Sequence, residues 1–310
     1  MKKLLFLSIF ALFLFSANSF AQGTGKAPSI GSVHQYYVNG TFNSPTSGSS
    51  SNYTWWISTD ATNLLTRTSL TDDFTVTSNG APYNTLTLGS AKGTGIEIKW
   101  NPTASITTPY YLVVQEDGQA PLCTNIKATA IQPTNNFTLL FEAIASNGTD
   151  LTDSPNRCPA PIALSASGLV ITYDYGTDNF MFKLTAQDLY SGWSFIGTFV
   201  NGLSGTSTLE YQIGGTAGTW LAYTNAATLP VPANVAGTEA VYFRVNTDNG
   251  SVEENIAVKT ISLTLSAVKD AGNNPVTEIT NHGGTDITSA PVQTQTVNAR
   301  PATTGIGTDE

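Results

Sequence analysis

Tyr53-Thr-Trp-Trp-Ile-Ser58 is the stretch that decides the fold, because aromatic and β-branched residues crowd it and a Ser- and Gly-rich loop, 41–51, precedes it. Residues of these types favour β-strands. Successive side chains of a strand point to opposite faces, so one of the adjacent indoles of Trp55 and Trp56 is expected in a core and the other in solvent. The stretch therefore predicts a core strand of a half-buried sheet.

Runs with the same alternation recur on both sides of this strand, each bounded by turn residues. About seven short strands within about 110 residues are typical of a β-sandwich, and they predict a first domain over 28–133. The strands that we expect besides the opening one lie at 34–38, 74–77, 85–88, 95–100, 110–115 and 126–131.

A second series of runs follows Pro133 and predicts a second Ig-like sandwich over 134–288. From about Ser289 to residue 310, Pro, Thr and Gly dominate, so we expect a disordered C-terminal tail at 289–310. The chain is thus predicted to be all-β, with two tandem sandwiches. The strands expected in the second one lie at 136–145, 169–173, 180–186, 193–200, 208–213, 220–223, 240–247 and 256–268.

The N-terminus has the three regions of a secretory signal peptide. Lys2 and Lys3 precede an apolar run at 4–15, and Ser19-Phe-Ala21 supplies the small residues of a cleavage site. Residues 1–21 are predicted to be removed, leaving a mature chain without a transmembrane segment. We expect the protein in the periplasm, on the cell surface or outside the cell.

The net charge and the two cysteines limit the kinds of ligand and metal site that the chain can be expected to have. The net charge is −9, and no basic patch could neutralise a nucleic acid backbone. In an oxidising compartment, Cys123 and Cys158 are expected to form a disulfide, which would close a loop of about 35 residues and add roughly 3–4 kcal/mol. Free thiols or an intermolecular bridge are the alternatives. The two cysteines and two distant histidines do not predict a zinc site.

Candidate polar sites are few. A catalytic nucleophile or metal needs a base beside it, and the two histidines, His34 and His282, are far apart in the sequence, so we predict no enzyme and no cofactor. Asp174 and Asp178 flank an expected turn in which two carboxylates and backbone carbonyls could bind calcium. The alternative is a solvated turn, in which aspartate makes only local hydrogen bonds.

Exposed aromatic rings are candidates for ligand binding, because they can stack on sugar faces while nearby polar groups bind hydroxyls. In a sandwich, however, most such rings fill the core. The candidates are Trp55, Trp56, Tyr36 and Trp220.

The first domain resembles the PKD-like Ig sandwich of surface and secreted proteins of Bacteroidota. The resemblance rests on the order of Ser32-Val-His-Gln-Tyr-Tyr-Val38, the opening strand, Gly95-Ile-Glu-Ile-Lys-Trp100, Tyr110-Tyr-Leu-Val-Val-Gln-Glu116 and Cys123. The second domain is similar to the accessory Ig-like domains found beside them. The resemblance implies a surface role of the kind associated with gliding or type IX secretion, although 299–310 does not look like a type IX sorting domain.

These features together predict an exported, non-enzymatic binding or structural protein of the cell surface. Its expected partners are envelope or surface proteins, docked by strand addition on an exposed sheet edge such as 136–145. A glycan-binding module is the alternative, with surface glycans as partners. A glycoside-active enzyme is a minor alternative, for which Asp72-Asp73 and Glu253-Glu254 are poor carboxylate pairs because neighbours on a strand face opposite ways.

Overall fold

The computed structural model divides the chain into two units. The first comprises residues up to 136 with 188–191 and 271–274, and the second comprises the remainder. Residues 1–22 are not among those described, so the signal peptide stays a prediction. The structure describes residues 23–38, 53–68, 72–78, 81–83, 95–117, 124–146, 156–189, 191–203, 206–215, 218–233, 239–251 and 256–301.

The first unit is a sandwich of two antiparallel sheets. One sheet has the order β3-β7-β5-β6 and the other has the order β4-β8-β9, while β1 and β2 form a separate hairpin. The strands are β1 (Gly23–Thr24), β2 (Ala27–Pro28), β3 (Val33–Tyr37), β4 (Tyr53–Ser58), β5 (Phe74–Ser78), β6 (Ala81–Tyr83), β7 (Gly95–Trp100), β8 (Tyr110–Asp117) and β9 (Thr124–Ile131).

Side chains from both sheets share the core of this first sandwich. Trp100 of β7 is fully buried and contacts the ring of Tyr110 on β8, with 4.9 Å between the ring centroids. Its indole Nε1–H donates a hydrogen bond of 3.3 Å to the hydroxyl of Tyr36 on β3. Alternation therefore puts one face of each sheet into a common core, as the sequence predicts.

The second unit contains a larger sandwich. Its two sheets have the orders β17-β16-β19-β14-β10-β21 and β11-β22-β20-β15-β18, and β12 and β13 form a separate hairpin. Its strands are β10 (Thr138–Ile144), β11 (Asn156–Arg157), β12 (Ala163–Ser167), β13 (Val170–Asp174), β14 (Thr177–Gln187), β15 (Trp193–Asn201), β16 (Thr206–Ile213), β17 (Leu221–Ala222), β18 (Thr228–Val231), β19 (Glu239–Asp248), β20 (Lys259–Asp270), β21 (Glu278–Thr280) and β22 (Val292–Val297).

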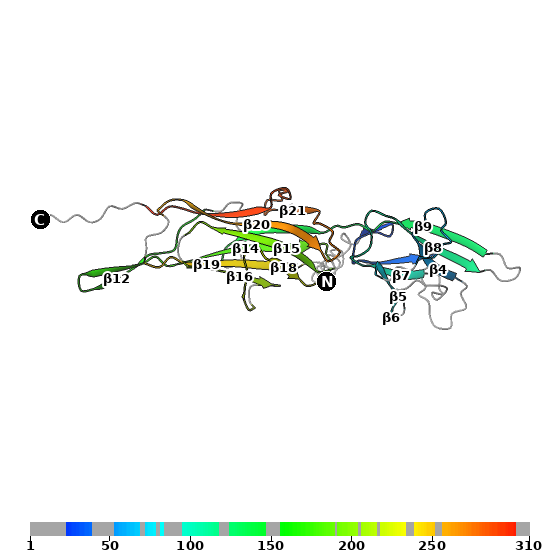
Figure 1. Ribbon diagram of the computed structural model, residues 1–310, viewed down its shortest axis with the longest axis horizontal. Helices are drawn as coiled ribbons and strands as arrows, with labels where there is room; N and C mark the ends of the chain where they lie inside the picture. The colour runs from blue at the N-terminus through cyan, green and yellow to red at the C-terminus, as the bar shows by residue number, and fades with distance from the viewer. Residues whose placement is uncertain are drawn as a thin grey trace, which may run out of the picture. The chain divides into compact units, whose positions relative to one another are not determined.

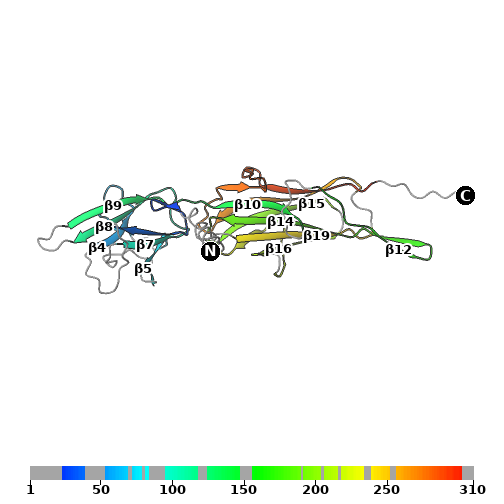
Figure 2. The ribbon, with the colours of Figure 1, turned by 180° about the vertical axis from the view of Figure 1, so that it is seen from behind.

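Aromatic contacts join the two sheets of this second sandwich. Phe195 of β15 meets Phe243 of β19 edge to face at 5.9 Å, and Phe182 of β14 meets Phe199 of β15 at 6.2 Å. Edge-to-face rings at this spacing are favourable beyond the area that they bury. In both views the long strands of this unit run side by side and the β12–β13 hairpin extends beyond their ends (Figures 1 and 2). The described residues contain strands and no helix, so the prediction of an all-β chain is confirmed.

The expected start of the disordered tail at Ser289 is wrong. Strand β22 pairs antiparallel with β20 and parallel with β11. Its inward residues are Gln293, Gln295 and Val297. Because two of these three buried side chains are polar amides, the sequence of the strand shows no alternation of apolar and polar residues. Gln295 satisfies its amide by donating to the carbonyl of Met181 at 2.8 Å and accepting from Nη1 of Arg157 at 3.0 Å. Residues 302–310 lie outside the described part of the chain.

The strand expected to offer a free edge, 136–145, does not do so along its whole length. Strand β10 pairs with β14 on one side over Thr138 to Ile144, and with β21 on the other over Thr138 to Leu140. The parallel partner, β21, comes from residues that follow the long strand β20. Strand addition at this part of β10 is therefore blocked by the protein itself.

Candidate functional site

A groove lies between β3 and β9, which are the edge strands of the two sheets of the first sandwich. Residues of the β1–β2 turn, β3, β4, β8 and β9 line it, and the cavity measures about 490 Å³. This volume falls in the range of ordinary ligand pockets. Among the described residues, β3 pairs with β7 and β9 pairs with β8, so each strand presents its second edge to the groove.

The groove begins where the sandwich stops being closed by main-chain pairing. At the closed end, the amides of Gln132 and Thr134 donate to the carbonyls of Lys26 and Pro28, both at 2.9 Å, and so join the segment before β3 to the segment after β9. Beyond this crossing, the strand pairs of β3 and β9 in the described part of the chain lie within their own sheets.

The inward residues of β9 explain why the core stays open. Thr129 and Lys127 lie opposite Leu112 and Val114 of β8, which both belong to the core. An alternating core strand would place apolar side chains at those two positions. Here the apolar residues Ile126, Ala128 and Ala130 of β9 take the opposite register positions and are exposed, while Ile131 at the end of the strand is buried in the core. The polar face of β9 thus points toward the groove.

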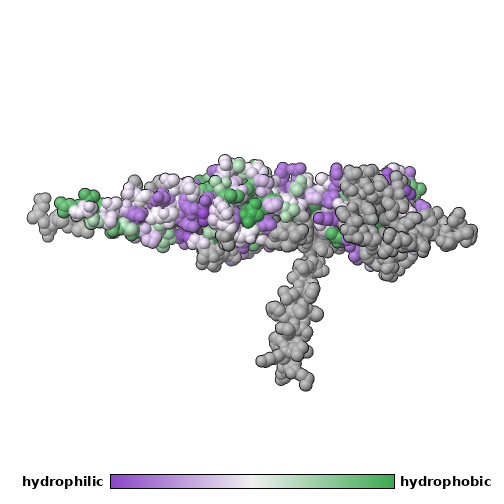
Figure 3. Space-filling view, turned by 90° about the horizontal axis from the view of Figure 1, so that it is seen from below, coloured by the Kyte–Doolittle hydropathy of each residue, from purple (hydrophilic) through white to green (hydrophobic). Residues whose placement is uncertain are grey.

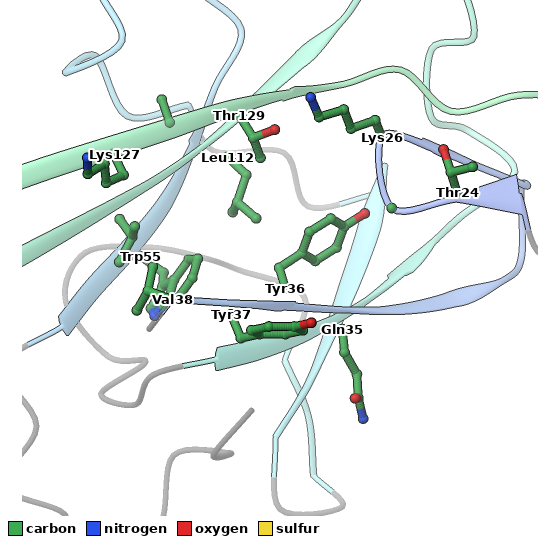
Figure 4. A pocket seen from close by; sticks show the side chains of 13 residues that line it. Thr24, Lys26, Gln35, Tyr36, Tyr37, Val38, Trp55, Leu112, Lys127 and Thr129 are labelled. Atoms are coloured by element: carbon green, nitrogen blue, oxygen red, sulfur yellow. The ribbon is translucent and has the colours of Figure 1, made fainter. Parts of the chain in front are cut away.

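The floor of the groove is apolar and its rim is basic. Tyr36, Trp55, Leu112 and Val114 are buried core residues that also line the cavity, whereas Lys26 and Lys127 stand at its margin. Figure 4 shows Tyr36 and Leu112 pointing into the space between the strands, while Gln35 and Tyr37 point to the other side of β3. A ligand that fits must bring apolar groups to the floor, and negative charge at the rim would favour it.

Burial raises the pKa of Tyr36 from 10.0 to about 12, and the hydrogen bond from the Trp100 indole acts against this effect only in part. The phenol at the floor of the groove is therefore neutral at physiological pH. It offers a ligand a polar atom but no charge.

A smaller cavity of about 50 Å³ continues the groove along β9. It shares Val38, Val114 and Lys127 with the larger one, and it ends near Asn125 and Glu116. The far end is fixed by Tyr53, whose hydroxyl donates to the carboxylate of Glu116 at 2.9 Å. The two cavities together form an elongated groove that follows β9 from Thr129 to Asn125, roughly 13 Å at 3.3 Å per residue.

Two of the four aromatic candidates, Trp55 and Tyr36, line the groove. The expectation that one of the adjacent indoles is exposed is wrong, because Trp55 is 3% and Trp56 is 1% exposed. Trp56 lies on the outer face of its sheet, where a loop covers it. Its Nε1–H donates to the carbonyl of Leu64 at 2.8 Å, and the guanidinium of Arg67 lies 4.8 Å from the ring centroid. The alternation of a strand predicts the sheet face on which a side chain lies. It does not predict whether a loop covers that face.

Trp220 belongs to the second unit and is half-buried, with the guanidinium of Arg244 4.3 Å from its ring centroid. It therefore belongs to a different unit from the residues that line the groove. A cation over the ring face occupies the surface that a sugar would use.

Asp174 and Asp178 have separate hydrogen-bond partners. The carboxylate of Asp174 accepts from the amide of Gly176 at 2.8 Å, as in a solvated turn. The carboxylate of Asp178 is buried and accepts from the side-chain amide of Asn249 at 2.9 Å. Over the described ranges no group of three or more His, Cys, Asp or Glu residues could hold a metal ion. The calcium site stays a prediction.

The proposed disulfide also stays a prediction. Cys158 is exposed, whereas Cys123 lies outside the described residues.

In the part of the chain that the structure covers, we find no helix with the length and apolar character needed to cross a membrane.

Lys26, Lys127 and Thr129 are groove residues that the sequence did not single out. A signal for them exists in 125–130, where apolar residues occupy one set of alternate positions and polar residues the other. The pattern does not say which set faces the core. In this strand the polar residues Lys127 and Thr129 face the groove, and this is fixed by the register of β9 against β8, which the sequence pattern does not give.

No protein-family model and no curated protein matches the chain, so the resemblance to PKD-like domains stays a prediction. Among solved structures, the CooA pilin subunit from enterotoxigenic Escherichia coli is 11% identical, with 52% of this chain and 99% of that chain covered and a TM-score of 0.25. The collagen binding domain of the Erysipelothrix rhusiopathiae surface protein RspB is 10% identical, with 68% and 72% covered and a TM-score of 0.22. The RrgB pilus protein from Streptococcus pneumoniae is 13% identical, with 61% and 35% covered and a TM-score of 0.24.

Proposed function

We propose that this chain is an exported, non-enzymatic binding protein of the cell surface, and that the groove of its first sandwich receives the partner. The observation that carries the proposal is an apolar groove flanked by strands β3 and β9, each of which pairs on one side only within the described residues. The signal-peptide pattern of residues 1–21 supports export.

The shape of the groove favours an extended polypeptide as the partner. A strand that pairs with the edge of β3 or β9 would gain main-chain hydrogen bonds, and its alternate side chains would enter the groove. The floor of Tyr36, Trp55 and Leu112 favours apolar side chains at those alternate positions. Lys26 and Lys127 favour an acidic residue beside them. The partner is thus a segment with alternating apolar residues and a nearby carboxylate.

The test is selection from a phage-displayed library of random peptides on the mature chain. We expect enrichment of peptides with alternating apolar residues, and their binding should be lost on Thr129→Trp, because the half-buried Thr129 points into the groove. Ala130→Trp is the matched control, since it puts the same bulk on the exposed, opposite face of β9. Equal binding by both variants would contradict the proposal.

The basic rim is tested by charge reversal. Lys127→Glu should weaken the binding of selected acidic peptides by about three- to tenfold, which corresponds to 0.6–1.4 kcal/mol for an exposed charge pair. Lys99→Glu is the control, because Lys99 is exposed on β7 and is not among the groove residues. The same loss in both variants would show a general charge effect and no role for the rim.

Glycan binding is the second candidate, favoured by one observation. Tyr37 is 54% exposed beside the groove, on the side of β3 that also carries Gln35 (Figure 4). An exposed ring with a neighbouring amide can hold a sugar. Trp55 and Tyr36 present little free surface for stacking. A glycan array probed with the mature chain and with Tyr37→Ala tests this candidate, and signals that Tyr37→Ala removes while Thr129→Trp retains would favour it over the peptide proposal.

A further inference from the structure

The hairpin of β12 and β13 is an exposed element of the second unit. Every residue of both strands is exposed, and in the described part of the chain the two strands pair only with each other. Two residues connect the strands, with Gly168 at a φ of +63° in the first position, as a type II′ turn requires. An isolated hairpin of this kind gains little stability from its own contacts.

One face of this hairpin is apolar. Leu164 lies opposite Tyr173, and Ala166 lies opposite Ile171, so these four side chains share a face. The other face carries Ser165 opposite Thr172, with Ala163 opposite Asp174 and Ser167 opposite Val170. The pattern is that of a strand pair with one side against a core, yet the structure places this side in solvent.

The exposed apolar surface is substantial. Leu164 is 65%, Ile171 53% and Tyr173 46% exposed, and Leu169 at the turn is fully exposed. Figure 3 shows hydrophobic residues gathered on this projecting hairpin. Contiguous apolar patches of this kind on ordered elements mark interaction sites.

The hairpin is held firmly at its base. Arg300 donates from Nη2 to the carbonyls of Ala160 and Tyr175, at 2.9 and 3.2 Å, and these two residues precede and follow the hairpin. The guanidinium also lies 4.9 Å from the ring of Tyr175, whose amide donates to the carbonyl of Gly250 at 2.8 Å. The second sandwich therefore presents the apolar face on an anchored arm.

We propose that the β12–β13 hairpin of one copy of this chain docks into the β3–β9 groove of a second copy. The inference rests on the proposed function of the groove and names its partner. Three properties match. Both elements have strands with an unpaired edge among the described residues, both are apolar, and the hairpin carries Asp174 with no basic residue from 162 to 174, whereas Lys26 and Lys127 stand at the groove.

The alternation of the hairpin also suits the groove. On β13, Ile171 and Tyr173 are two residues apart, which is the spacing of side chains that enter a groove from an added strand. The groove extends along about four residues of β9, comparable to one strand of the hairpin. Pairing between β13 and a groove strand would place its apolar face on the floor. The opposite face, with Ser165, Thr172 and Asp174, would be left toward solvent, so Asp174 would meet the lysines at the rim of the groove.

Such a contact is heterologous, because a surface of the second unit meets a different surface on the first unit of the next copy. Each copy would keep one free groove and one free hairpin. Repetition therefore gives either a ring or an open chain of copies.

The first test is the association state of the mature chain in sedimentation velocity, up to about 1 mM. We expect concentration-dependent growth beyond a dimer. Ile171→Asp should raise the concentration needed for half-association at least about tenfold, as for a buried contact residue. Thr172→Asp, on the polar face of the same hairpin, is the matched control and should associate as the unmodified chain does. Both positions are exposed, so neither variant disturbs a core.

The decisive test is a mixture of two variants. Thr129→Trp has a filled groove and an intact hairpin, and Ile171→Asp has an intact groove and a blocked hairpin. At a concentration that half-associates the unmodified chain, each variant alone should be largely monomeric, and the mixture should give a one-to-one complex that does not grow, since only one contact can form. Association of Thr129→Trp alone would show that hairpins pair with each other, and no complex in the mixture, or an unmodified chain that stays monomeric, would overturn the inference.

The two proposals can fail separately. If the unmodified chain binds library peptides through the groove but stays monomeric, the groove is a binding site and the second copy is not its partner. If Thr129→Trp leaves both peptide binding and self-association unchanged, the function of the groove fails together with the inference.

Discussion

Tyr36 links the groove to the core of the first sandwich, because its hydroxyl lines the groove and accepts a hydrogen bond from Trp100. Its pKa rises from 10.0 to about 12 in the folded protein. The unfolded chain therefore loses this proton first as the pH rises, and folding stability falls between about pH 10 and pH 12. At 1.36 kcal/mol per pKa unit, the contribution of this one residue is about 3 kcal/mol.

The measurement is urea unfolding at about pH 9 and about pH 11.5, followed by tryptophan fluorescence. Tyr36→Phe cannot ionise, so we expect its loss of stability between the two pH values to be smaller than that of the unmodified chain. Burial also raises the pKa of Tyr110 and of Tyr223, so some alkaline destabilisation should remain in the variant. An identical pH dependence in the two proteins would contradict the assignment.

Strand β22 is the element that most changes the description of the second sandwich. It pairs with β20 over Val292 to Val297 and buries Val297 and Gln295 completely. We expect a chain that ends at Ser289 to lose the cooperative unfolding of the second sandwich, because β20 loses its partner β22 along one edge, including the residues opposite Ile261 and Leu263. A chain that ends at Pro301 keeps β22 and should unfold like the complete one. Calorimetry distinguishes the two, and equal transitions would mean that β22 contributes little.

The strands of the two sandwiches show which features could be predicted from the sequence. Alternation located β4 at its observed limits, and it found β8 because the aromatic and branched residues of both strands are unmistakable. It missed β22, because two of its three inward residues are the amides Gln293 and Gln295; Gln295 is satisfied by Arg157 and Met181. It also misplaced Trp56, because burial by a loop leaves no periodic signal. The groove was hidden for a related reason, since the polar set of β9 faces inward.

At the scale of the whole molecule, the two sandwiches differ in what they offer a partner. The first leaves an apolar groove between two strand edges, whereas the second presents an apolar hairpin on an arm that Arg300 anchors. Both features are unusual for a protein that acts alone, because edges and apolar faces are normally covered or charged. A protein that pairs with a strand of its partner would need the groove and the hairpin to be accessible to that partner.

Hydrogen exchange over the whole mature chain, with and without a peptide selected on the groove, tests the central claim most directly. The account predicts slower exchange at amides of β3 or β9 when the peptide is bound, because an added strand accepts hydrogen bonds from their free edge. The strands of the second sandwich should exchange as before. Unchanged exchange in both β3 and β9 under saturating peptide, or protection confined to the second sandwich, would contradict a groove that binds by strand addition.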